Sequence, residues 1–117
     1  MSSTEEVHAA LRTWAKGILT LEAAVEALIA ADRGRWVDPG QPWVRRAEPD
    51  GWWLDFDLMA NELGPLSGGE RRYLSLIASI ASDDVNVPLG EAVTGLDHVH
   101  LRLVLDAIAH AGGVYAR

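Results

Sequence analysis

A Leu-Ser-Gly-Gly-Glu-Arg-Arg stretch in the middle of the chain has the clearest potential for chemistry. Ser67 and Glu70 have the spacing of a capping box, so a helix is expected to begin here with unpaired N–H groups in its first turn. Such groups bind anions, and Gly68 and Gly69 would let a phosphate approach them while Arg71 adds positive charge. The Glu70 carboxylate would compete for that place if it folds back onto Ser67. Two interpretations follow, a well-capped helix or an anion-binding turn formed by Ser67, Gly68, Gly69 and Arg71.

Tryptophan and arginine are concentrated between residues 33 and 53. Adjacent Trp52 and Trp53 would point to opposite faces of a strand, so one indole would lie near the surface unless both faces are covered. Tryptophan beside arginine is typical of the centre of a protein interface. The same composition can hold single-stranded nucleic acid, but a net charge of −7 disfavours contact with phosphates. The sequence therefore predicts a protein-binding surface made of Arg33, Arg35, Trp36, Trp43, Arg45, Arg46, Trp52 and Trp53.

Ionisable side chains recur at every fourth position near the C-terminus, in the order His98, Arg102, Asp106 and His110. A row of this kind could transfer protons, but it lacks the His-x-x-x-His spacing that places two metal ligands on one helical face. We interpret it as a solvated face in which Arg102 pairs with Asp106. The chain has no cysteine, which excludes thiolate metal sites and cysteine nucleophiles. We expect no metal, no cofactor and no catalytic activity.

The central stretch also resembles the signature motif of ABC-type ATPases, in which a Leu-Ser-Gly-Gly-Gln/Glu turn opens a helix and contacts a γ-phosphate held by the opposite subunit. The similarity covers residues 66–97, with 85–91 at the place of the family's hydrophobic strand and 95–97 at that of the following loop. It implies phosphate contacts by Ser67, Gly68 and Gly69, a catalytic carboxylate at Glu91 and a loop aspartate at Asp97.

Pro88 interrupts the place of the family's strand, and the chain departs from that family at two further points. Gly90 stands where the family has a metal-supporting aspartate, and no Gly-x-x-x-x-Gly-Lys-Ser/Thr phosphate loop is present. Both departures argue against hydrolysis by this chain alone. The role that the resemblance leaves is an accessory one beside a partner ATPase.

Two helices and a hairpin are expected to precede the central stretch. Ser3 and Glu6 form a capping box for a helix over residues 4–16, ended by Gly17, and Thr20 caps a second helix that packs against the first. The turn Glu48-Pro49-Asp50-Gly51 separates two apolar stretches and predicts a β-hairpin. Its register stays open. A two-residue loop would place Trp43, Ala47, Trp52, Leu54 and Phe56 on one face, whereas a three-residue loop with a bulge would set Arg45 against Asp55.

The C-terminal half is expected to hold two longer helices. Asp57 would cap a short turn over residues 58–63, and Ser67 would cap a long helix whose buried face includes Tyr73, Leu74 and Ile77. Residues 85–89 alternate like a strand, which would extend the hairpin as a third short strand. Asp97 caps the last helix. Its expected core positions are Leu101, Val104, Leu105, Ile108 and Ala111.

Composition fixes the broad class of the protein. With 117 residues, of which 49% are hydrophobic and 23% charged, the chain is expected to form one α+β domain over residues 1–117, around a single core. No apolar run is long enough for a membrane span, and the acidic N-terminus is unlike a secretion signal, so we expect a cytoplasmic protein. The predicted function is a small acidic module that binds another protein, as an inhibitor, an immunity- or antitoxin-like protein or an adaptor. The alternative is a phosphate- or nucleotide-binding accessory protein, and a homo-oligomer is compatible with both.

Overall fold

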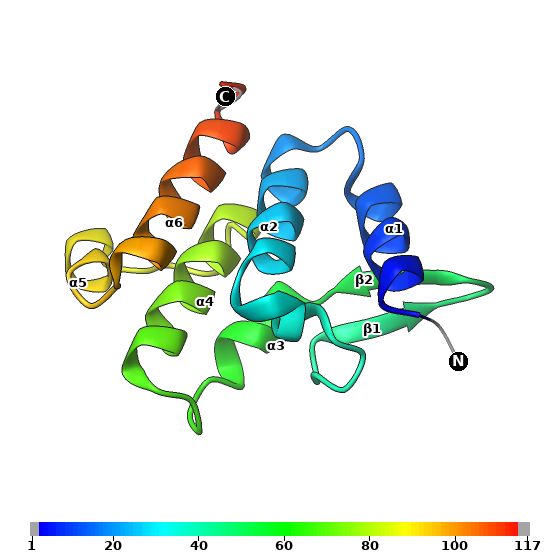
Figure 1. Ribbon diagram of the computed structural model, residues 1–117, viewed down its shortest axis with the longest axis horizontal. Coiled ribbons are helices and arrows are strands. Elements are labelled where there is room, and N and C mark those ends of the chain that lie inside the picture. The colour runs from blue at the N-terminus through cyan, green and yellow to red at the C-terminus, as the bar shows by residue number, and fades with distance from the viewer. Residues whose placement is uncertain (1–2, 115–117) are drawn as a thin grey trace.

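The computed structural model describes residues 3–114 and places a two-stranded sheet at one side of a group of packed helices, next to the first helix (Figure 1). The predicted α+β class is confirmed. In this range no helix is long and apolar enough to cross a membrane. The elements in chain order are α1 (Thr4–Ala15), α2 (Leu19–Ala30), the 3₁₀ segment η1 (Asp32–Val37), β1 (Val44–Ala47), β2 (Gly51–Leu54), α3 (Phe56–Asn61), α4 (Gly68–Ala81), α5 (Leu89–Val93) and α6 (His98–Ala111).

Helix α2 lies at the centre of the molecule. It packs against α1 on one side and against α4 and α6 on the other, as Figure 1 shows. Alanine makes this possible because a small side chain lets a neighbouring helix approach closely. The buried residues of α2 are Ala23, Ala24, Val25, Ala27 and Leu28.

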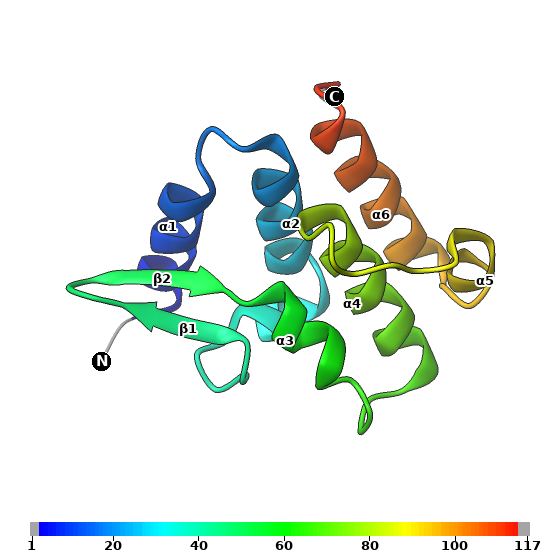
Figure 2. The same ribbon diagram turned by 180° about the vertical axis from the view of Figure 1, so that it is seen from behind.

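The hairpin has a register that neither sequence alternative described. Val44 pairs with Leu54 and Arg45 with Trp53, which leaves a three-residue loop without the bulge that would have set Arg45 against Asp55. Val44, Trp52 and Leu54 are buried, and α1 packs against β2 (Figure 2). The side chains that face the core therefore select the register, as expected when one face of a hairpin is buried.

Two helix starts each lie two residues before their predicted positions. Asp55 rather than Asp57 caps α3, because the strand ends at Leu54 and the Asp55 carboxylate accepts the Leu58 N–H at 3.0 Å. Helix α2 begins at Leu19, so Thr20 lies within its first turn and not at the cap. The capping boxes at Ser3 and Ser67 are confirmed.

The predicted strand over residues 85–89 is wrong. In the described part of the chain the sheet consists of β1 and β2 alone, and Leu89 already belongs to α5. Figure 2 shows the segment before α5 crossing α4, away from the hairpin. Val85 and Val87 pack against the core instead, so their alternation reflects contact with helices and not strand pairing.

The core face of α6 was predicted only in part. Val104 and Ala107 are buried, and Leu103 packs against the core, because α2 and α4 both contact α6 from that side. Leu105 and Ile108 were expected in the core but are 51% and 46% exposed. The helix is therefore more apolar than its packing requires.

Candidate functional site

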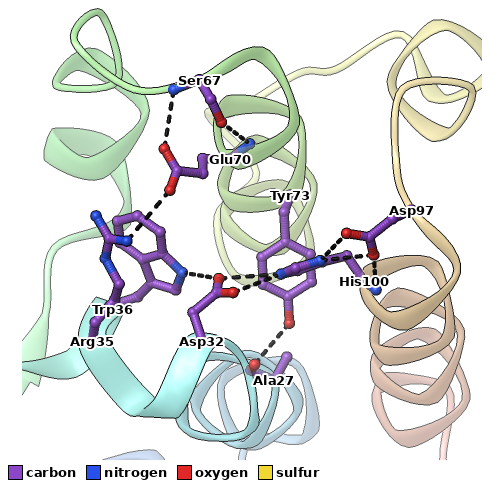
Figure 3. A network of polar contacts seen from close by, with 9 residues as sticks. All are labelled: Ala27, Asp32, Arg35, Trp36, Ser67, Glu70, Tyr73, Asp97 and His100. Atoms are coloured by element: carbon purple, nitrogen blue, oxygen red, sulfur yellow. Dashed lines mark hydrogen bonds and ion pairs between the residues drawn. The ribbon is translucent and has the colours of Figure 1, made fainter.

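The start of α4 is closed by its own side chains. The Ser67 hydroxyl accepts the Glu70 N–H at 3.2 Å, and Glu70 Oε1 accepts the Ser67 N–H at 3.0 Å (Figure 3). Glu70 Oε2 lies 3.5 Å from Arg35 Nη1 on η1. The carboxylate that could have competed with a ligand anion thus folds back onto the first turn, where its negative charge is favourable.

A pocket of about 410 Å³ lies along the neighbouring face of α4. Gly68, Arg71, Arg72 and Ser75 line it at helical spacing, opposite Val87, Pro88, Glu91 and Ala92 and beside Ala60 and Leu63. Arg71 donates to the Gly64 carbonyl at 3.3 Å. No ion pair to either arginine is present among residues 3–114, which leaves two cations beside this pocket without a carboxylate partner.

A second pocket, of about 300 Å³, lies between the start of α4, η1 and the start of α6. His100 stands at its wall with both ring nitrogens against carboxylates. Nδ1 is 2.9 Å from Asp97 Oδ1, and Nε2 is 3.1 Å from Asp32 Oδ1 (Figure 3). His100 is also edge-on to the Tyr73 ring at 4.9 Å, so η1, α4 and the start of α6 meet at this imidazole.

The backbone around Asp32 is unusual. Asp32 and Arg33 have φ angles of 50° and 60°, and Gly34 follows at 76°. Left-handed conformations are uncommon for residues with a Cβ, so the surrounding contacts have to hold them. The Asp32 carboxylate accepts the Trp36 Nε1–H at 2.6 Å as well as facing His100. This turn is what brings the end of α2 to the start of α6.

Protonation in this cluster follows from its contacts. Burial lowers the pKa of His100, but hydrogen bonds to Asp97 and Asp32 outweigh it and raise that pKa above its ordinary value. The His100 backbone and side-chain N–H groups lower the pKa of Asp97. Burial, and then the Asp32 charge, raise the pKa of Tyr73, which keeps its hydroxyl protonated. The arrangement therefore favours an imidazolium between two carboxylates.

The tryptophans of the predicted protein-binding surface lie mainly in the core. Trp36, Trp43 and Trp52 are 1%, 2% and 9% exposed, and Trp53 is half-buried. Trp43 Nε1 donates to the Trp36 carbonyl at 2.7 Å. Indole N–H groups satisfied inside the fold are typical of structural tryptophans. Of the four indoles, that of Trp53 is the most open to a partner.

The arginines of the same set remain exposed. Arg35 lies 4.4 Å from the Trp36 ring centroid, Arg46 lies 5.1 Å from that of Trp52, and Arg45 lies 5.8 Å from that of Trp53. Arg33 is exposed in the left-handed turn. Guanidinium groups of Arg35, Arg45 and Arg46 therefore cover aromatic faces on this part of the molecule.

The histidine row is divided between two environments. The expected pair of Arg102 with Asp106 is present at 3.9 Å, whereas His110 lies 3.4 Å from Glu22 on α2. In the described range no three His, Cys, Asp or Glu side chains are grouped so as to hold a metal ion. The pairing of His100 with Asp32 spans 68 residues and has no sequence signature. The one local signal of this cluster in the sequence is the position of Asp97 three residues before His100.

An apolar stripe runs along the flank of α6, formed by Leu101, Leu105 and Ile108 at i, i+4 and i+7. Leu105 and Ile108 are about half exposed, and Leu101 is partly exposed.

Comparison with protein-family models, curated proteins and solved structures found no match to the chain.

Proposed function

We propose that this chain is a non-enzymatic module that binds another protein. The observation that carries the proposal is the α6 stripe of Leu101, Leu105 and Ile108, of which Leu105 is 51% exposed. A helix on the surface of a globular protein normally presents polar residues to water. Apolar residues grouped on one flank are typical of a surface that another protein covers.

The hairpin provides a second, smaller contact surface. Trp53 is half-buried and has Arg45 across the sheet, and Arg46 is exposed nearby. Tryptophan and arginine contribute strongly to protein interfaces. Arg45 and Arg46 would meet acidic groups of the partner, whereas the exposed Glu48 and Asp50 of the adjoining turn would meet basic ones.

The two surfaces can be tested separately by affinity capture from the native host. One variant carries Leu105→Ser with Ile108→Ser, and another carries Trp53→Ser. Val99→Ser is the matched control, because Val99 is 69% exposed on the same helix but lies outside the stripe. We expect a partner protein that is retained by the control and lost from the double variant.

Circular dichroism would first establish that each variant is folded. A captured set that is the same for the wild type and for both surface variants would contradict the proposal. Loss of the partner from the Trp53 variant alone would indicate that the interface lies on the hairpin and not on α6.

A second candidate function is binding of a phosphate-containing ligand, either by itself or with a partner ATPase. Arg71 and Arg72 favour it, since both line the 410 Å³ pocket without a carboxylate partner in the described range. Closure of the capping box places Glu70 beside Ser67 and Gly69. An anion would therefore be held on the Gly68 and Arg71 side of the helix.

Titration with inorganic phosphate and with ATP tests this candidate. We expect NMR shifts of the Gly68 amide and of the Arg71 and Arg72 Nε–H groups, which Arg71→Gln with Arg72→Gln would abolish. Arg33→Gln, which removes an exposed charge elsewhere, should leave binding unchanged. Absence of any shift at millimolar ligand would exclude the candidate.

A further inference from the structure

His100 links two parts of the fold through one imidazole ring. Its Nδ1 lies 2.9 and 3.1 Å from the two Asp97 oxygens, and its Nε2 lies 3.1 Å from both Asp32 oxygens. We propose that His100 is a proton-dependent clasp that fastens the start of α6 to the left-handed turn after α2. This inference is independent of the proposed function.

The chemistry of imidazole provides the switch. An imidazolium donates from both nitrogens and satisfies both carboxylates, whereas a neutral ring has a single N–H. One carboxylate then faces a lone pair. We expect the remaining proton to stay on Nδ1, because Asp97 is in the same helical turn and is closer to the ring. Deprotonation therefore breaks the hydrogen bond between α6 and Asp32.

The charged and titratable groups around the ring do not replace that bond. Asp32 approaches from η1, Asp97 caps α6, and Tyr73 on α4 stays neutral because burial raises its pKa. Glu70 lines the same pocket, but its carboxylate is bound to the Ser67 N–H and to Arg35. No arginine or lysine on these elements pairs with Asp32 in the described part of the chain.

Release of the clasp would widen the 300 Å³ pocket at the start of α4. Its walls are Asp32, Ser67, Gly69, Glu70, Gly95, Leu96, Asp97 and His100. The 95–97 loop closes against α4, since a Cβ built on Gly69 would lie 3.8 Å from the Gly95 carbonyl oxygen. Loss of the bond to Asp32 removes the link that holds this loop toward η1. The pocket, which measures about 300 Å³ with the clasp formed, thus widens as His100 loses the proton.

The test follows imidazole and indole signals by NMR between about pH 5 and pH 9, the range in which a perturbed histidine titrates. We expect the Trp36 indole N–H, which is bonded to Asp32, to shift with the same midpoint as His100. Hydrogen exchange of the amides at the start of α6 should accelerate over the same range. A midpoint below the ordinary value of 6.5, or a Trp36 signal that does not follow His100, would overturn the proposal.

Variants make the result specific to this residue. His100→Gln keeps a neutral polar side chain and should remove the pH response of Trp36 and of the α6 amides. Asp32→Asn is the second variant if His100→Gln does not fold. It removes the acceptor charge with little change of volume and should lower the pH midpoint of the His100 titration. The control is His98→Gln, an exposed histidine on the same turn, which should leave both responses unchanged. A response that persists in His100→Gln would also contradict the clasp.

Discussion

Tyr73 joins α4 to the central helix through a single polar atom. Its side chain is 1% exposed, and its hydroxyl donates to the Ala27 carbonyl of α2 at 2.7 Å. A buried acceptor that loses its only side-chain donor costs free energy because water cannot replace the bond. The residue therefore contributes both to packing and to hydrogen bonding between α2 and α4.

We predict that Tyr73→Phe lowers the free energy of unfolding by about 1 to 3 kcal/mol, the usual cost of an unsatisfied buried group. Ser79→Ala provides the comparison, because the Ser79 hydroxyl donates within α4, to the Leu76 carbonyl. That change should cost less than Tyr73→Phe. Urea denaturation of the three proteins measures both differences, and equal stability of wild type and Tyr73→Phe would contradict the assignment.

Gly95 leaves room for the Arg72 side chain. A Cβ built on Gly95 would overlap the Arg72 side chain, although its backbone angles are open to other residues. We predict that Gly95→Ala costs about 1 kcal/mol, as expected for a small side chain forced into an occupied place. In the Arg72→Ala background the same change should cost close to nothing. A double-mutant cycle measures this coupling, and additive effects would show that the two residues are independent.

At the scale of elements, the caps determine where the helices of the candidate sites begin. The Ser67 and Glu70 box sets the first turn of α4, which lies between the two pockets on that helix. We predict that Ser67→Ala costs about 1 kcal/mol of unfolding free energy. Ser3→Ala should cost less, because the start of a terminal helix can fray without disturbing the core. Thermal unfolding of both variants compares them, and a larger loss for Ser3→Ala would reverse the expected order.

Local signals predicted these starts because a capping box depends on two residues three positions apart. The same local signals failed for residues 85–89, where alternation arises from contact with helices, and for α6, where a broad apolar surface is covered on one side only. The hairpin register depended on which indoles the core accepts. The pairing of His100 with Asp32 depended on a turn 68 residues away. Long-range packing of this kind leaves no fixed spacing for a sequence pattern to detect.

At the scale of the whole molecule, the charged groups determine how stability depends on pH. The Gly17 N–H and then His110 lower the pKa of Glu22, and His100 lowers that of Asp97. A carboxylate with a depressed pKa stabilises the fold above its unfolded pKa, and the contribution is lost as the pH falls through the folded value. For His100, whose pKa is raised, the contribution is present below 6.5 and is lost as the pH rises through the folded value.

We therefore predict maximum stability between the titration of these carboxylates and that of His100. The urea concentration at the unfolding midpoint, measured at a series of pH values, should decrease on both sides of this pH range. In Glu22→Gln the fall on the acid side should be shallower, while the fall on the alkaline side should persist. Stability that rises steadily through the titration of His100 would disagree with the charge assignment.

The alanines of α2 have a consequence for how far this sequence can vary. Ala23 and Ala24 are fully buried, and Ala27 is 6% exposed, on a helix enclosed by α1, α4 and α6. A larger side chain at any of them would push a neighbouring helix outward and widen the distances at the Tyr73 and His100 contacts. The size of one methyl group thus sets the helix spacing on which the pocket beside His100 depends. In any chain that keeps this architecture, small residues at these three positions should coincide with an intact polar network beside α4.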